Sequence, residues 1–261
     1  MFGLFRSKPL LEESSTEWLF HAYAWALENF GGDIFHRDTI LVTPSNRHFP
    51  EKLLATPEQK VVAAFGRVRD YAGMQGWPCE LIALVPDMEP PPPPNISSVT
   101  PRGPQGAVSI HDEKQSIPIA FDPGMVGKPL VLVAAFAQQL AYHLGRAIKK
   151  EVPGGEELRG PASDLLAVFM GFGLFQANSA MTACRGGCSG CAPVQKLGYL
   201  TEAEFVYALA IFCVLKDIQN EEVEPYLKKT LQPFFRKAIK ELNETRGDDI
   251  LRLKTLRMTT C

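Results

Sequence analysis

The sequence has no excess of charge of either sign and no long apolar run. Its 27 basic and 29 acidic residues give a formal net charge of -2, which argues against a nucleic-acid partner, because proteins that bind nucleic acids usually carry a strongly basic surface. The two most apolar stretches, 165–175 and 207–215, are each shorter than the ~18 residues that a membrane-spanning helix needs. We therefore expect buried core helices at both places and no membrane span.

We also expect no secretion signal. The apolar run in the opening residues, MFGLFRSKPLLEE, is too short for the core of a signal peptide, and acidic residues follow it at once. With 46% hydrophobic and 21% charged residues, the composition is that of a soluble globular protein. We expect the protein to be cytoplasmic.

Common motifs for nucleophilic catalysis and phosphate binding are missing. No serine stands in a G-x-S-x-G sequence, and GMVGKP at 124–129 lacks the spacing of a P-loop. The GFG at 171–173 falls inside a predicted helix, where glycine more often permits close packing than binds a ligand. These patterns favour neither a serine hydrolase nor a nucleotide-binding protein.

The first 86 residues predict helices alternating with strands. Capping boxes, in which a hydroxyl side chain and an acid or amide three residues later bond each other's backbone, indicate helix starts at Ser14 and Thr56. The Gly31-Gly32 pair should end the first helix. The predicted elements are a helix at 14–30, a strand at 39–42, a helix at 57–71 and a strand at 80–85.

Five consecutive prolines, at 90–94, interrupt this alternation. Proline joins neither a helix interior nor a strand ladder, so we expect an extended spacer or surface loop here. We predict a single domain, 1–261, in which a proline-rich loop at 87–106 lies between an N-terminal α/β part (13–86) and a helical part (117–256).

The second part predicts one strand followed by helices. A capping box of Thr201 and Glu204 indicates one helix start. The predicted elements are a strand at 117–121 and helices at 129–149, 161–181, 201–218, 221–242 and 246–256. Strands and helices followed by a mostly helical C-terminal half make an α+β fold class.

The helix predicted at 129–149 carries the polar sequence AQQLAYH at its centre. In zinc hydrolases with an H-E-x-x-H motif, two histidines one turn apart bind one metal, and the glutamate takes a proton from the bound water. In one large group a third ligand is the glutamate of a later E-x-x-x-D segment, whose aspartate supports the metal ligands from behind.

Over residues 117–215 the chain resembles these zincin-like, metallopeptidase-type proteins, including uncharacterised bacterial ones. VAAFAQQLAYHL is similar to their first helix, and GPASDLLAVFMGFGLFQANSA, which opens at Gly160, is similar to their second. The resemblance implies a zincin-like α+β fold.

The chemistry of that family depends on residues that this chain has replaced. Gln138 stands at the first histidine, Gln139 at the general base, Tyr142 at the second histidine and Gly160 at the third ligand, while Asp164 still matches. An amide is a poor zinc ligand and no base, and glycine has no side chain. The resemblance therefore implies a catalytically inactive protein, a pseudoenzyme without a cofactor, with an interaction or regulatory role and an unidentified protein partner.

Polar residues left without a metal must find other partners. We expect Gln138, Tyr142 and Asp164 to hydrogen-bond across the two helices where the metal would lie; the alternative is that the adjacent glutamines are partly solvated. His143, five residues after Gln138, is turned about 140° from that face at 3.6 residues per turn. A hydrolase that recruits metal through His143 and Asp164 is a further alternative.

Three of the six cysteines are clustered in CRGGCSGC, as Cys184, Cys188 and Cys191. Their spacing equals that of the iron–sulfur loop in radical S-adenosylmethionine enzymes, but here the loop follows an apolar helix rather than the first strand of a barrel. Clustered thiolates in a cytosolic protein can bind metal, form a redox pair or remain free. The alternative function is thus a metalloprotein that binds zinc or an iron–sulfur cluster through this loop. Cys213 should be a buried core thiol.

Overall fold

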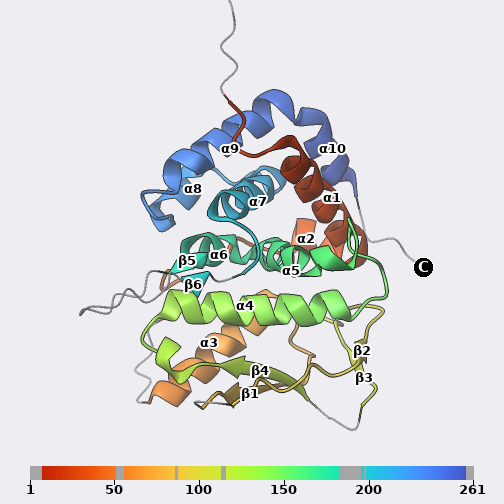
Figure 1. Ribbon diagram of the computed structural model, residues 1–261, viewed down its shortest axis with the longest axis vertical. Helices are drawn as coiled ribbons and strands as arrows, with labels where there is room; N and C mark the ends of the chain where they lie inside the picture. Colours follow the sequence, from red (N-terminus) through yellow and green to blue (C-terminus); the bar gives the residue numbers. More distant parts are fainter. Residues whose placement is uncertain are drawn as a thin grey trace, which may run out of the picture.

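The computed structural model describes residues 8–50, 56–85, 88–112, 116–182, 195–196 and 198–256. Helices are stacked in layers over a small parallel sheet (Figure 1), so the fold is α+β as predicted. The helices and helical turns are α1 (Glu13–Asn29), α2 (Gly32–Arg37), α3 (Pro57–Tyr71), η1 (Pro123–Met125), α4 (Pro129–Arg146), η2 (Glu156–Leu158), α5 (Arg159–Ala167), η3 (Val168–Phe172), α6 (Gly173–Ser179), α7 (Glu202–Leu215), α8 (Asn220–Val223), η4 (Glu224–Tyr226), α9 (Gln232–Thr245) and α10 (Gly247–Thr255). The strands are β1 (Cys79–Ala83), β2 (Ile96–Ser97), β3 (Ser109–Ile110), β4 (Ile117–Phe121), β5 (Met181–Thr182) and β6 (Gln195–Lys196).

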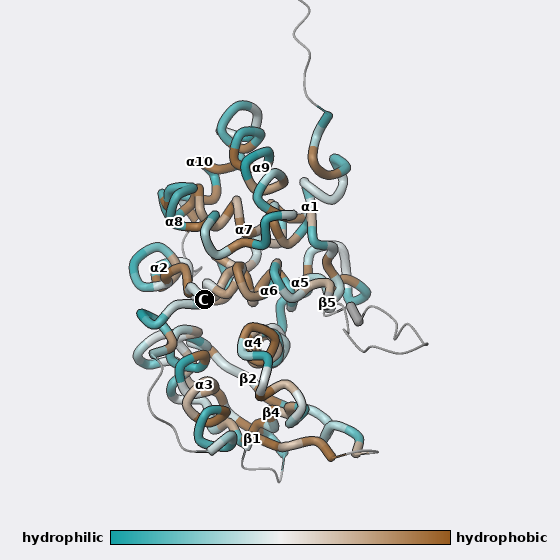
Figure 2. The backbone as a smooth tube through the Cα atoms, turned by 90° about the vertical axis from the view of Figure 1, so that its left-hand side faces the viewer, coloured by the Kyte–Doolittle hydropathy of each residue, from teal (hydrophilic) through white to brown (hydrophobic). Residues whose placement is uncertain are grey.

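Helix α4 lies at the centre of the molecule. Figure 1 shows α3, β1 and β4 below it, and α5 and α6 above it, with α7 to α10 stacked further up. Figure 2 shows α4 end-on between the same two sets of elements. Its residues Phe136, Leu140 and Leu144 are fully buried. Because α4 contacts both layers, its two faces must both carry side chains that suit a protein interior.

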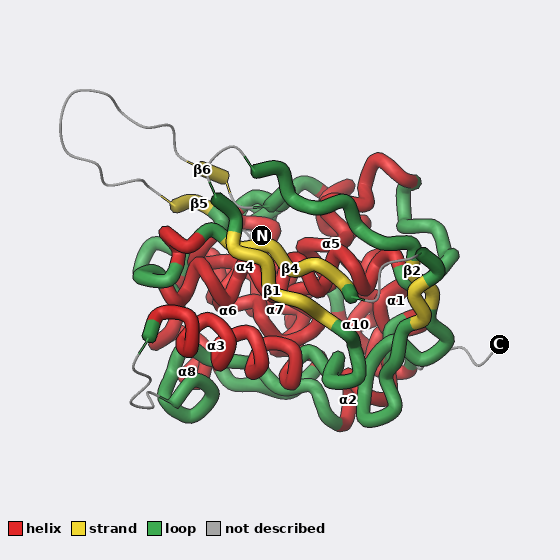
Figure 3. The backbone as a smooth tube through the Cα atoms, turned by 90° about the horizontal axis from the view of Figure 1, so that it is seen from below, coloured by secondary structure: helices red, strands yellow, loops and turns green. Residues whose placement is uncertain are grey.

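The sheet beneath α4 consists of β1 and β4, seen from below in Figure 3. The strands are parallel and pair from Cys79 with Ile117 to Ala83 with Phe121. Parallel strands need a crossover, and here the crossover contains the prolines and the β2–β3 hairpin, which was not predicted. Strand β4 has the predicted bounds, and β1 begins one residue earlier and ends two residues earlier than predicted.

Arg102 fixes the end of the proline-rich loop to the body of the protein. Its side chain is buried, and its Nε donates to the backbone oxygen of Ala72 at 2.8 Å, at the end of α3. One of its terminal nitrogens donates to Thr39 Oγ1 at 3.2 Å. Residues from both sides of the loop, such as Tyr23 and Phe205, belong to one hydrophobic cluster.

The helix predicted at 161–181 is interrupted by a π-helical turn, η3, at Gly171. This glycine has φ +98°, and a Cβ atom there would lie 2.1 Å from the backbone oxygen of Ile40. Its own oxygen accepts from the nitrogen of Val42 at 2.9 Å. The strand predicted at 39–42 is therefore wrong, because this segment bonds to a helix backbone instead of a sheet. The glycine permits close packing, as predicted.

Helix starts were predicted with mixed success. The capping boxes at Thr56 and Thr201 are confirmed. The one at Ser14 is wrong, because α1 begins at Glu13 and Ser14 is already inside the helix; the residue before the helix makes no side-chain cap. The short helix α2 was not predicted. The helix predicted at 221–242 is divided into α8 and α9, with the turn η4 and its Pro225 between them.

One helical run passes a length and composition test for a membrane span among the described residues. It is Glu156–Ser179, with 24 residues, and 78% of its most apolar window is buried inside the protein. Core helices of soluble proteins pass the same test, so the absence of a membrane span stays a prediction.

Candidate functional site

Gln138 of α4 and Asp164 of α5 meet between the two helices. Gln138 Nε2 donates to Asp164 Oδ1 at 2.7 Å. The other carboxylate oxygen, Oδ2, accepts from the backbone nitrogens of Tyr199 at 2.5 Å and Leu200 at 2.8 Å. Asp164 has no exposed surface, so its charge is stabilised by these hydrogen bonds. The expected bond between Gln138 and Asp164 is confirmed.

Tyr142 makes neither of the hydrogen bonds expected of it, so this part of the prediction was wrong. Its ring lies beside the guanidinium of Arg146, whose Cζ is 5.6 Å from the ring centroid. The ring of His143 lies edge-on at 5.4 Å between centroids. A cation–π contact places positive charge beside the position that a second zinc ligand would hold.

Gly160 lies one turn before Asp164 on α5 and is covered by the ring of Tyr199. A Cβ atom at Gly160 would lie 2.7 Å from two carbons of that ring. Gly198 is equally constrained: its φ is +91°, and a Cβ there would lie 2.7 Å from Asp164 Oδ2. The sequence analysis missed Gly198, Tyr199 and Leu200; the glycine just before the capping box at Thr201 was the available signal.

Gln139 points away from Asp164, toward strand β4. Its Oε1 accepts from the nitrogen of Ala120 at 2.8 Å, and its Nε2 donates to the oxygen of the same residue at 2.6 Å. One turn further on, His143 Nε2 lies 3.3 Å from the oxygen of Pro118. Helix α4 therefore carries two polar rows. The row with Gln138 faces α5 and meets Asp164, and the row with Gln139 and His143 faces β4. His143 and Asp164 thus make their contacts on different sides of α4.

His143 is only 4% exposed. Its pKa is lowered to about 4, chiefly by burial; the contact with the Pro118 oxygen partly opposes this shift, and the nearby charge of Arg146 adds to it. The ring is therefore neutral at pH 7, with its proton on Nε2 if it donates to Pro118. Nδ1 is buried and has no hydrogen-bond partner within the described part of the chain.

The predicted cysteine site, Cys184, Cys188 and Cys191, lies outside the described residues. Of the two described cysteines, Cys213 is fully buried as predicted, and burial raises the pKa of its thiol. Burial also raises the pKa of Cys79 to about 12. Within the ranges that the structure covers, no three His, Cys, Asp or Glu side chains are grouped in a way that could hold a metal ion.

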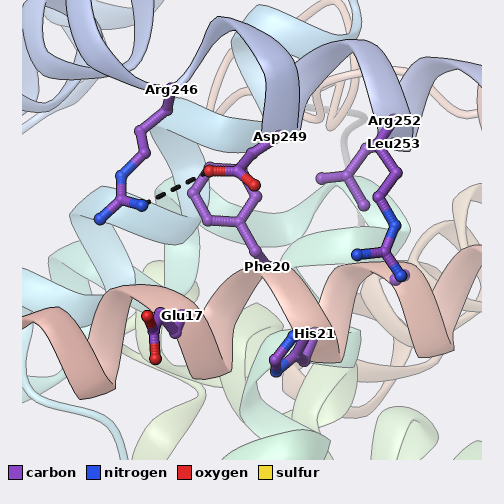
Figure 4. A pocket seen from close by; sticks show the side chains of 8 residues that line it. Glu17, Phe20, His21, Arg246, Asp249, Arg252 and Leu253 are labelled. Atoms are coloured by element: carbon purple, nitrogen blue, oxygen red, sulfur yellow. Dashed lines mark hydrogen bonds and ion pairs between the residues drawn. The ribbon is translucent and has the colours of Figure 1, made fainter.

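Two surface hollows lie away from these residues. The first, of about 250 Å³, lies between α1 and α10 (Figure 4) and is lined by Glu17, Phe20, His21, Ala24, Arg246, Asp249, Arg252 and Leu253. Arg246 is paired there with Asp249 at 3.5 Å. The second, of about 320 Å³, lies near Arg102 at the ends of α2 and α3. Neither is lined by residues of α4 or α5.

Comparisons with protein-family models, with curated proteins and with solved structures found no match to this chain. The resemblance to zincin-like proteins therefore stays a prediction from the sequence.

Proposed function

We propose that this protein is a catalytically inactive, metallopeptidase-like protein of zincin-like architecture, and that it serves to bind or regulate a protein partner in the cytoplasm. The hydrogen bond from Gln138 to Asp164 is the observation that carries the proposal. Metal-bound histidines commonly donate their second ring N–H to a carboxylate. Here a carboxylate in the supporting position accepts an N–H from the residue in the first ligand position.

The same helices lack the groups needed for hydrolysis. Gln139 cannot act as a base, and both polar atoms of its amide are bonded to Ala120. Tyr142 packs against the cation of Arg146, which opposes a second cation nearby. The space beside Gly160 is filled by an aromatic ring. Gln139, Tyr142 and Gly160 thus bond to or pack against other parts of the chain, which supports a binding scaffold rather than an enzyme.

Metal content and hydrolysis together test this proposal. Protein purified without an affinity tag would be incubated with zinc, desalted and analysed by plasma mass spectrometry, and casein hydrolysis would be followed in parallel. A variant with Cys184, Cys188 and Cys191 changed to serine serves as the control, because it removes the three thiols that could bind zinc. We expect this variant to retain no zinc and neither protein to hydrolyse casein.

The outcomes separate the two hypotheses. Zinc held by the cysteine variant, with hydrolysis that Gln139→Ala abolishes, would contradict the proposal. Zinc held by the unmodified chain and lost from the cysteine variant would instead support the metalloprotein alternative, and would leave the interpretation of α4 and α5 in place.

A further inference from the structure

Strand β4 uses one of its two edges to pair with β1. The nitrogen of Ile117 donates to the oxygen of Pro78 at 2.7 Å, and the nitrogen of Leu84 donates to the oxygen of Phe121 at 2.9 Å. Alternate residues of a strand direct their backbone groups to opposite edges. Ile117 and Phe121 therefore face β1, and Pro118 and Ala120 face outward.

An outer edge with unpaired N–H and C=O groups is a template on which another extended chain can add as a strand. On β4 that template is already occupied. The amide of Gln139 accepts from the N–H of Ala120 and donates to its C=O, at 2.8 and 2.6 Å. A primary amide has the same donor and acceptor as a peptide group, so Gln139 makes the two bonds that a neighbouring strand would make.

The next outward position is closed as well. Pro118 has no N–H to offer, and its oxygen lies 3.3 Å from His143 Nε2. The geometry explains why one helix can reach both positions. Four residues advance about 6 Å along a helix and two residues advance about 6.6 Å along a strand. Since Gln139 meets Ala120 and His143 meets Pro118, α4 runs antiparallel to β4 and the two spacings match.

We propose that Gln139 is an internal occupant of the β4 edge, an autoinhibitory contact that closes this edge to an extended polypeptide segment. When the side chain of Gln139 turns away, Ala120 presents both of its backbone groups to an added strand. This inference rests on the proposed function and deepens it, because it names the partner of the site as an extended polypeptide and Gln139 as the residue that controls its access.

The test compares full-length variants at neighbouring positions of α4. Gln139→Ala removes the amide, and Gln139→Met removes both hydrogen bonds while nearly keeping the volume, which provides a second variant if the alanine protein folds poorly. Gln138→Met is the matched control, because the same change is made one residue away on the row that faces Asp164. Gln139→Ala combined with Ala120→Pro also removes the outward N–H of β4.

Hydrogen exchange at the amide of Ala120 reports whether the edge has opened. Fluorescence anisotropy of a labelled, extended peptide of alternating threonine and valine then reports whether a strand can add. Both Gln139 variants lose the two hydrogen bonds to the backbone of Ala120. We therefore expect about tenfold faster exchange and about tenfold tighter peptide binding in these variants than in the unmodified protein. Gln138→Met should change neither, and Ala120→Pro should cancel the gain in binding.

Two results would overturn the proposal. One is faster exchange at Ala120 with no gain in peptide binding. The other is equal binding by the unmodified protein, by Gln138→Met and by the Gln139 variants. Both are independent of metal content, so a failure here is distinguishable from a failure of the proposed function, which is decided by zinc and hydrolysis.

Discussion

The amide of Gln138 and the carboxylate of Asp164 are joined by a 2.7 Å hydrogen bond across the interface of α4 and α5. The carboxylate also accepts two backbone N–H groups that immediately precede α7. One buried anion thus connects two helices and the start of a third. This arrangement serves stability, and under the proposed function it also preserves the contact that would orient a metal ligand.

Asp164→Ala should destabilise the protein strongly. Its removal leaves the N–H groups of Gln138, Tyr199 and Leu200 without their acceptor, and breaking such a buried, charged network costs about 3–5 kcal/mol. Gln138→Met removes one donor and should cost about 1 kcal/mol. Urea unfolding of both variants measures the difference. Equal, small losses would show that the carboxylate is not the centre of this network.

Gly171→Ala should cost more than about 3 kcal/mol, because alanine would be held at positive φ and in collision with the oxygen of Ile40. Gly66→Ala is the matched control. Gly66 lies inside α3 with nothing within 4 Å of its Cβ position, so alanine there should stabilise the protein by about 0.5–1 kcal/mol. Thermal unfolding would reveal opposite shifts. A tolerated alanine at position 171 would contradict the close approach of the 39–42 segment to η3.

The neutral state of His143 predicts a loss of stability in acid. The unfolded chain takes up a proton near pH 6.5, whereas the folded protein does so only near its pKa of about 4. Stability from this group is therefore complete above pH 6.5 and is lost as the pH falls toward 4, by about 3 kcal/mol at most. His143→Gln keeps a donor for Pro118 and does not titrate. Its unfolding free energy, subtracted from that of the unmodified protein, should show this slope; parallel pH profiles would refute it.

Thr201→Ala should cost about 1 kcal/mol, because the threonine hydroxyl accepts the backbone N–H of Glu204 at the start of α7. Ser14→Ala should change stability by less than about 0.5 kcal/mol, since Ser14 caps no helix. Chemical denaturation measures the loss of stability in each variant. A larger loss in Ser14→Ala than in Thr201→Ala would show that Ser14 does cap the first helix, as the sequence pattern predicts.

The parts of the fold that local patterns determine could be predicted from the sequence. The strand at 117–121 and the capping boxes at Thr56 and Thr201 are confirmed because each depends on residues within a few positions of one another. The segment at 39–42 has a strand-like pattern, but its partner is the backbone of Gly171. No local pattern carries that information, because the contact joins residues far apart in the chain.

The candidate site shows the same limit. Helical spacing and a resemblance were enough to place Gln138 opposite Asp164. They could not place Tyr199 against Gly160, because the path of the chain before α7 depends on tertiary packing. They also could not show that Gln139 bonds to Ala120, since the sequence does not reveal which strand lies beside α4.

The most direct test of the account restores the missing ligands. Gln138→His, Gln139→Glu, Tyr142→His and Gly160→Glu would be combined in a chain whose Cys184, Cys188 and Cys191 are serine. The glutamate at position 160 displaces the ring of Tyr199, which is 64% exposed and can turn into solvent.

The measurement is zinc per folded chain by plasma mass spectrometry, with the same protein retaining Tyr142 as the control. If α4 and α5 have zincin-like geometry, the rebuilt chain should hold about one zinc ion, and the control and parent chains should hold none. A rebuilt chain that unfolds cooperatively and yet holds no zinc above the control would contradict the account.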